Sequence, residues 1–182
     1  MKHRDVVRRY DARTGRARGE VEIEAGAIQR IAVSPDGRRV AVVGCKRFQL
    51  LDVHTLGVVA AAAHRALSSG ASALAFSPCG RAVVFTAGRV LFVWDAVAGR
   101  ELHRVALGAG GVLDAAFTPD GRRLVTAGKD GAARLWDAAG WNCEHTFAWD
   151  AGPLRAAAVS PDGTRAAVAG DRGRVVVWDL DA

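Results

Sequence analysis

Hydroxyl and carboxylate side chains recur two residues apart along the chain, and such a pair could act as a nucleophile and its partner. The hydroxyl opens four similar segments, at Ser34, Ser77, Thr118 and Ser160. The carboxylate follows in three of them, at Asp36, Asp120 and Asp162. A catalytic serine needs a base to take its proton, and no histidine is placed to do so. Because each Asp lies in a Pro-Asp-Gly sequence, where a carboxylate can bond to the nearby backbone, we interpret these residues as turn formers.

Histidine and cysteine are common metal ligands, and the chain has them at His3, His54, His64, His103, His145, Cys45, Cys79 and Cys143. His103 and His145 occupy equivalent positions in successive segments, too far apart to share an ion whose ligands lie about 2 Å away. The cysteines show no CxxC spacing, and we interpret them as reduced packing residues. A Gly-rich phosphate-binding loop is also missing from the sequence. We therefore predict no catalytic residue, no metal site and no cofactor.

The same segments divide the chain into repeats. Their starts are 43, 41 and 42 residues apart, at Ser34, Ser77, Thr118 and Ser160. A second landmark, an Asp after a large apolar residue, recurs with spacings of 43, 42 and 42 residues, at Asp52, Asp95, Asp137 and Asp179. Two landmarks with one period indicate an array of one supersecondary unit, which we treat as a single domain over residues 1–182.

The sequence of each repeat predicts four β-strands. A short apolar segment runs into Pro-Asp-Gly, a strong hairpin signal, and a second strand such as "RRLVTAG" follows. A Gly-containing turn leads to a third strand, "ARLWD", and a more polar fourth strand comes last. Four strands in about 42 residues is the size of one β-propeller blade, so the predicted class is all-β with four-stranded antiparallel blades. The predicted divisions are residues 1–26 (N-terminal strands), 27–63, 71–107, 112–149 and 153–182 (four blades, the last without its outer strand).

The "SPDG" turn, the "DGAARLWD" strand and the period together resemble the WD-repeat β-propellers over essentially the whole chain. The Trp-Asp pairs are Trp94-Asp95, Trp136-Asp137 and Trp178-Asp179, with degenerate equivalents at Leu51-Asp52 and Tyr10-Asp11. The resemblance implies a buried network of a His, a Ser or Thr, the Trp and a tight-turn Asp. Here the His is missing, the turn Asp survives as Asp130 and Asp171, and Thr86 and Thr126 are the candidate hydroxyl partners. We expect these blades to rely on apolar packing and to have modest stability.

The number of blades raises the question of closure, because propellers of this family commonly close into rings of seven or eight. The sequence "DVVRRYD" aligns with a third strand and "GEVEIE" with a fourth, whereas "VVVWDLDA" ends after a third. We predict that two chains join head to tail into an eight-bladed ring of two-fold symmetry. The closing strands would contain Gly19, Glu20, Val21, Glu22, Ile23 and Glu24 of one chain and Val175, Val176 and Val177 of the other. The alternative is a truncated fragment of a larger WD-repeat protein.

The resemblance also implies recognition by surface loops. One rim would carry Lys46, Arg47, His64, Arg65, Arg89, Lys129, Asp130, Trp149, Asp150, Asp171 and Arg172. Trp149 is either a binding anchor or a cap on its own blade. The opposite rim would carry Arg38, Arg39, Arg81, Arg122, Arg123 and Arg165, which either meet an acidic partner or keep the rim soluble.

Charge and hydropathy narrow the class of partner. The net charge is +6, but arginines are scattered through every repeat, so we do not expect a nucleic-acid partner. The sequence contains no apolar run of about 20 residues and no apolar stretch at its start, so no membrane contact and a cytoplasmic location are expected. We predict a non-catalytic interaction scaffold whose partners are a second copy of itself and a protein or peptide. A propeller enzyme with a central metal site is the alternative from a different class.

Overall fold

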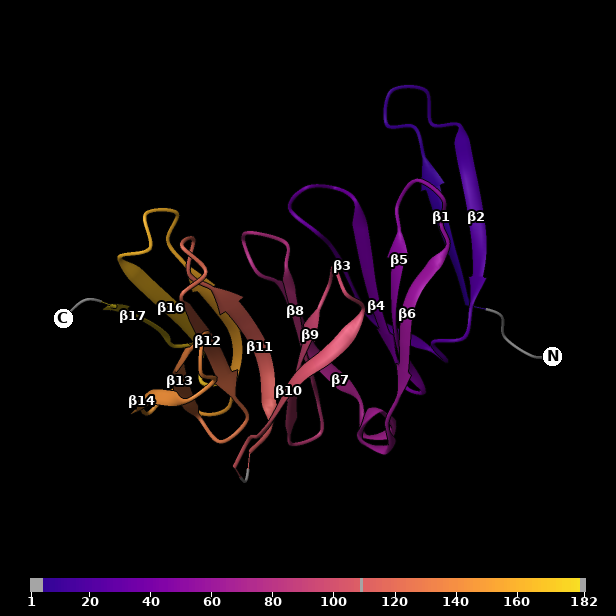
Figure 1. Ribbon diagram of the computed structural model, residues 1–182. Helices are drawn as coiled ribbons and strands as arrows, with labels where there is room; N and C mark the ends of the chain where they lie inside the picture. Colours follow the sequence, from indigo (N-terminus) through magenta and orange to yellow (C-terminus); the bar gives the residue numbers. More distant parts are fainter. Residues whose placement is uncertain (1–4, 109, 181–182) are drawn as a thin grey trace.

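The computed structural model describes residues 5–108 and 110–180 as an arc of twisted antiparallel sheets that follow one another in chain order (Figure 1). The first two strands, β1 (Asp5–Tyr10) and β2 (Ala17–Ile23), form a separate pair, here called the N-terminal hairpin. This hairpin and the last strands lie at opposite ends of the arc.

Three four-stranded sheets and one three-stranded sheet follow the hairpin. Sheet 1 contains β3 (Ile28–Val33), β4 (Arg39–Gly44), β5 (Arg47–Asp52) and β6 (Val58–Ala63). Sheet 2 contains β7 (Ala71–Phe76), β8 (Ala82–Ala87), β9 (Val90–Asp95) and β10 (Arg100–Ala106). Sheet 3 contains β11 (Val112–Phe117), β12 (Arg123–Gly128), β13 (Ala132–Asp137) and β14 (Cys143–Ala148). Sheet 4 contains β15 (Leu154–Val159), β16 (Arg165–Gly170) and β17 (Val175–Asp179). The predicted all-β class with four-stranded antiparallel sheets is confirmed.

The turns between first and second strands form where the sequence predicted them. In sheet 3, Thr118 Oγ1 donates to Asp120 Oδ1 at 2.5 Å and accepts from the Arg123 N–H at 3.0 Å. Gly121 has φ +71°, a left-handed conformation that glycine adopts without strain. The Asp carboxylate thus closes the turn, as expected of a turn former.

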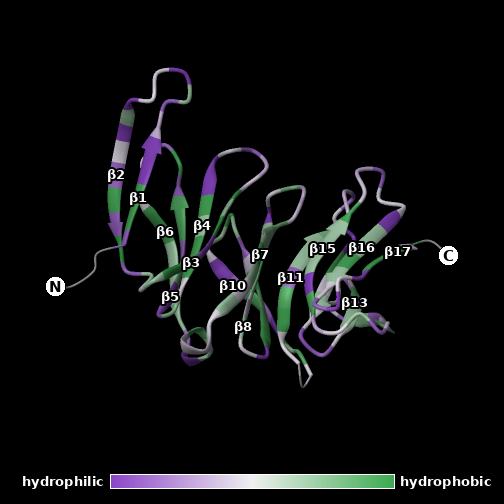
Figure 2. Cartoon of the chain, turned by 180° about the vertical axis from the view of Figure 1, so that it is seen from behind, coloured by the Kyte–Doolittle hydropathy of each residue, from purple (hydrophilic) through white to green (hydrophobic). Residues whose placement is uncertain are grey.

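The core lies between neighbouring sheets, because side chains of a strand point alternately to its two faces. In sheet 2, Phe85 and Trp94 pack toward sheet 1, against Phe48 and Leu50. Val84, Leu91 and Val93 of the same sheet pack toward sheet 3. Figure 2 shows the resulting hydrophobic colour along β11, in contrast to the hydrophilic colour along much of β1. Each internal sheet is therefore buried on both faces.

The N-terminal hairpin packs on the outer part of sheet 1. Val7, Val21 and Ile23 contact the cluster around Val42 and Leu51. The carboxylate of Asp5 accepts a hydrogen bond from the Gly26 N–H at 2.6 Å, and this bond ties the start of β1 to the segment before sheet 1. β2 is paired along its length with β1.

One sequence expectation was wrong, and one short helix was not predicted. Cys79 and Cys143 are exposed and Cys45 is half-buried, all as free thiols, so the two exposed cysteines are not packing residues. The segment after β6 forms a short 3₁₀-helix, η1 (Arg65–Ser69), which the sequence did not predict; His64 caps it by accepting from the Ala66 N–H at 3.1 Å. Among the described residues, no helix has the length and apolar character needed to cross a membrane.

Candidate functional site

One rim of the arc is built from the turns between second and third strands, and each turn presents a cation there. The cations are Lys46, Arg89, Lys129 and Arg172, one from each of the four sheets in order. The backbone of each turn is held by the segment that precedes the first strand of its own sheet. The Lys129 N–H, for example, donates to Gly111 O at 3.0 Å, and the Lys46 N–H to Ala25 O at 2.9 Å. The cations therefore project from fixed turns.

A hollow of about 400 Å³ opens on this rim, which we call the glycine hollow. Its walls include the backbone of Gly70, Gly88 and Gly111, and Arg89 and Lys129 also line it. Both basic side chains are exposed. None of its lining residues carries a carboxylate. An anionic group could approach the backbone closely here, because glycine has no side chain to obstruct it.

The acidic residues of this rim are already engaged. Asp130 accepts from Arg134 Nη2 at 2.5 Å, and this hydrogen bond is the main cause that lowers its pKa. Asp171 accepts from Arg155 at 2.5 and 2.7 Å, which lowers its pKa in the same way.

The remaining ion pairs of the rim involve two of the predicted contact residues. Arg47 pairs with Glu24 at 3.0 Å, and Arg172 pairs with Asp150, which also pairs with Arg174 at 3.3 Å. Four of the basic residues predicted on this rim have no ion pair with another described residue, and these are Lys46, Arg65, Arg89 and Lys129. The rim therefore carries an excess of positive charge.

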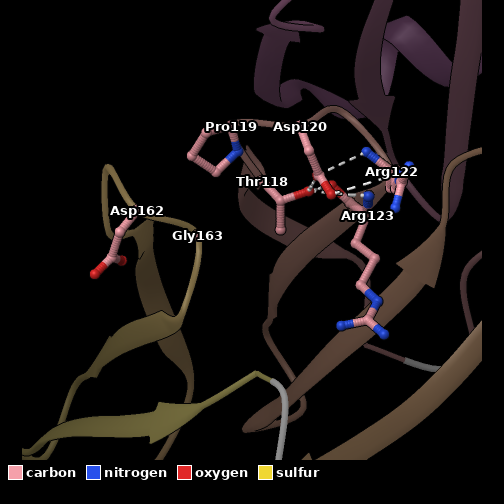
Figure 3. Close-up of a pocket in the computed structure, with 7 residues that line it drawn as sticks. All are labelled: Thr118, Pro119, Asp120, Arg122, Arg123, Asp162 and Gly163. Atoms are coloured by element: carbon pink, nitrogen blue, oxygen red, sulfur yellow. Dashed lines mark hydrogen bonds and ion pairs between the residues drawn. The ribbon is translucent and has the colours of Figure 1, made fainter.

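The opposite rim has mixed charge. A smaller hollow of about 250 Å³ lies between the turns of sheets 3 and 4. Figure 3 shows Asp120, Arg122, Arg123 and Asp162 around it. Hydrogen bonds from Thr118 to Asp120 and from Ser160 to Asp162 are the main causes that lower the pKa of these carboxyls, that of Asp162 to about 2. Both carboxylates are ionised at neutral pH, so the arginines do not stand alone on this rim.

Some of the arginines on this rim form ion pairs, and others form none with a described residue. Arg39 pairs with Asp52 at 2.8 Å and Arg165 with Asp179 at 3.4 Å, so both bind the Asp that closes a third strand. Arg123 contacts Glu144 at 3.3 Å. The remaining members, Arg38 and Arg81, are exposed beside their turns.

The Trp of each third strand points toward the preceding sheet, but only one of the three finds a polar partner. Trp136 Nε1 donates to Thr126 Oγ1 at 2.9 Å. Thr86 does not serve Trp94 in this way, so the expectation for Thr86 was wrong. Thr86 lies on the other face of sheet 2, where it accepts from the Ala73 N–H at 3.0 Å.

The comparison with known families follows the same strands. The family WD40, described as "WD domain, G-beta repeat", matches residues 101–137 and 141–179. The chain is a WD-repeat protein. The first match spans β10 to β13 and the second spans β14 to β17, so each WD repeat joins the outer strand of one sheet to three strands of the next. No curated protein was found to match the chain.

In this WD-repeat protein, the predicted anchor Trp149 lies between sheets 3 and 4. Its ring stacks on that of Phe147, with 5.5 Å between the ring centroids, and contacts the ring of Trp178, with 5.0 Å between the centroids. With His145 and Leu180 these rings line a groove of about 370 Å³. The contacts of Trp149 therefore support its packing role more than the role of a free anchor.

Metal ligands do not gather in the part of the WD-repeat protein that the structure describes. No group of three or more His, Cys, Asp or Glu residues lies close enough together there to hold an ion. His54, His103 and His145 are exposed on separate sheets, and His3 lies outside the described residues. Sequence reasoning missed the glycine hollow, because its walls come from four loops that are distant in sequence.

Proposed function

We propose that this WD-repeat protein is a non-catalytic scaffold that binds an acidic segment of a partner protein at the glycine hollow. WD40 repeats indicate a protein-interaction scaffold. The observation that carries the finer proposal is the pair formed by Arg89 and Lys129, two cations without an ion pair beside a hollow with no carboxylate in its walls. A carboxylate or phosphate of the partner would form charge-assisted hydrogen bonds with them. Lys46 and Arg65 extend the basic surface beyond the hollow.

Binding of a fluorescein-labelled peptide with alternating Glu and Gly residues, followed by fluorescence anisotropy, tests this proposal. The double substitution R89A/K129A should weaken binding about tenfold or more, since each lost charge-assisted bond corresponds to roughly 1.5–3 kcal/mol. The matched control is R38A/R122A, which removes two exposed arginines from the opposite rim and the same net charge. Equal losses in both double variants would mean that the peptide responds to net charge alone, and the proposed site would be wrong.

We also propose that two copies join head to tail into a closed eight-bladed ring, with β2 of each chain completing sheet 4 of the other. Each chain would supply three complete sheets and share two junctions. Apolar side chains at both ends of the arc support this. Ile31 and Val33 of sheet 1 are 58% and 59% exposed, and Val175 and Val177 of sheet 4 are 68% and 60% exposed. Bare apolar faces and open strand edges favour association.

Light scattering after size exclusion tests the assembly against the chain mass of 19.1 kDa. The expected mass is twice that value and persists on dilution. A monomer at every concentration would contradict the ring and favour the interpretation that this sequence is part of a larger WD-repeat protein.

The scaffold proposal includes no turnover, no bound metal and a cytoplasmic location. WD-repeat proteins are generally non-catalytic. Elemental analysis of the purified protein would contradict the proposal if it found a stoichiometric ion, and cell fractionation tests the location.

A further inference from the structure

The third-strand position of a blade is present at both ends of the described chain. Tyr10 and Asp11 lie at the end of β1 in the same way that Trp178 and Asp179 close β17. Each residue of β17 has a number 168 higher than its equivalent in β1. The carboxylate of Asp11 accepts from the Arg13 and Thr14 N–H groups at 3.1 and 2.9 Å, as the carboxylate of Asp95 accepts from the two N–H groups at the equivalent positions. β1 therefore has the geometry of a third strand, and β2 is its fourth.

β1 fits its place on sheet 1 imperfectly. Its inward positions are Val7, which packs in the apolar cluster, and Arg9. The Arg9 Nη1 donates to Val53 O at 2.8 Å and to His54 O at 3.1 Å, but its Nε is buried without a hydrogen-bond partner. A buried polar group without a partner is unfavourable. A third strand with an apolar residue at this position would avoid that cost.

β17 has such residues at the equivalent positions. With the offset of 168, Val7 corresponds to Val175 and Arg9 to Val177, and both valines are exposed in the single chain. The outer edge of β17 pairs with no strand among the described residues. The exposed pair of Arg8 with Glu20, at 2.8 Å, would be lost, and such surface pairs contribute little.

We propose that β1 is a placeholder that β17 of a second copy displaces, so that β17 pairs with β2 and its valines pack on sheet 1. This inference rests on the proposed head-to-tail ring. β17 stays with its own sheet, because the Trp178 ring contacts the Trp149 ring and Leu180 is buried against sheet 3. β1 is the strand that leaves, since its contacts on sheet 1 are replaced by better-matched ones.

Engineered disulfides distinguish the two partners of β2. In a background in which Cys45, Cys79 and Cys143 are replaced by Ser, the variant E20C/V176C places a thiol on each side of the proposed junction. The matched control R8C/E20C places them across the existing β1–β2 pair, whose residues are directly opposite. After oxidation, intact mass and non-reducing electrophoresis should show covalent dimers for E20C/V176C, and at most a minor fraction of closed monomer for R8C/E20C.

The outcomes separate the inference from the proposal on which it rests. A wild-type dimer in which R8C/E20C closes completely and remains dimeric, while E20C/V176C forms no covalent dimer, would overturn the placeholder and leave a head-to-tail dimer in which β2 stays paired with β1 and the copies meet through the apolar faces of sheets 1 and 4. A wild-type protein that is monomeric at every concentration would overturn both.

A substitution at the junction gives a second readout. Val177→Arg restores to β17 the residue type that β1 carries, and it should weaken dimerisation at least tenfold. The control is Val97→Arg, a valine that is 68% exposed on a turn of sheet 2 and outside the junction. Both variants should melt like wild type when monomeric, because both valines are exposed. Dimerisation of Val177→Arg equal to that of Val97→Arg would overturn the inference.

Discussion

Trp136 donates its indole proton to Thr126 at 2.9 Å inside sheet 3, and this bond has no counterpart in the sheets on either side. Phe85 of sheet 2 and Val168 of sheet 4 occupy the position of Thr126, eight residues after the residue that opens each repeat. The Nε1 atoms of Trp94 and Trp178 are accordingly buried without a partner among the described residues. The stability of neighbouring repeats therefore depends on different contacts.

Replacing Thr126 with Val should destabilise the protein by about 1–3 kcal/mol, because it leaves the Trp136 N–H buried and unpaired. The free energy of unfolding in urea measures the effect. Thr126→Ser keeps the hydroxyl, so it should retain much of the stability that Thr126→Val loses. An equal loss in both variants would contradict the role of this hydrogen bond, because Thr126→Ser keeps the hydroxyl that Trp136 contacts.

The reverse change in sheet 4 should stabilise. Val168→Thr would give Trp178 Nε1 an acceptor, and the new hydroxyl could donate to the carbonyl of Val176 as Thr126 does to that of Arg134. We expect a gain of up to about 1 kcal/mol in the same urea measurement. The control Val43→Thr places a hydroxyl among Phe48 and Leu50, and it should cost about 1–3 kcal/mol. A loss in Val168→Thr as large as that in the control would contradict the repair of the Trp178 contact.

Acid should weaken the fold below about pH 4. The pKa of Asp11 is lowered to about 2, chiefly by its hydrogen bond from Arg18, and that of Asp162 to about 2, chiefly by the bond from Ser160. A carboxyl whose pKa is lower in the folded state stabilises above its unfolded pKa, near 3.9, and this contribution is lost as the pH falls toward 2. Melting temperatures between pH 2 and pH 7 should decline in that window, and Asp162→Asn should decline less steeply than wild type. An unchanged slope would contradict the role of Asp162.

Two glycines with equally open surroundings separate backbone strain from crowding. A Cβ at Gly37 or at Gly108 would meet nothing within 4 Å, but only Gly37 has a left-handed φ, of +69°. Gly37→Ala should therefore lower stability by about 1 kcal/mol, whereas Gly108→Ala should be neutral or slightly stabilising. Thermal melting of the two variants in parallel checks this, and equal effects would contradict the role of backbone conformation.

The repeating turns made the sheets predictable from sequence. Pro-Asp-Gly and the Trp-Asp pairs act locally, through bonds within a few residues, so each strand could be placed from its own segment. The mistake over Thr86 arose from alternation along the strand. In sheet 2 the turn between β8 and β9 contains only Gly88 and Arg89. An alignment of the repeats at this turn matches Thr86 with Thr126, whereas an alignment at the start of each repeat places Thr86 one residue further along the strand. In a β-strand a shift of one residue moves a side chain to the opposite face.

The rim was less predictable than the sheets. The residue types at Arg89 and Lys129 were visible in the sequence, but the hollow between them depends on how four loops approach one another. Whether Trp149 is a binding anchor or packs between sheets also depends on a distant residue, because its partner Trp178 lies in the next repeat. Patterns in sequence fix the neighbours within a hairpin and leave open those between sheets.

The burial of each internal sheet on two faces gives the molecule a gradient of local stability. Sheet 2 loses contacts on both sides if it opens, whereas sheet 4 loses contacts with sheet 3 only. In such a linear array, opening free energies follow the number of neighbours. In the monomer, amide protons of β16 and β17 should therefore exchange with solvent sooner than those of β8 and β9, so that the arc frays inward from its ends.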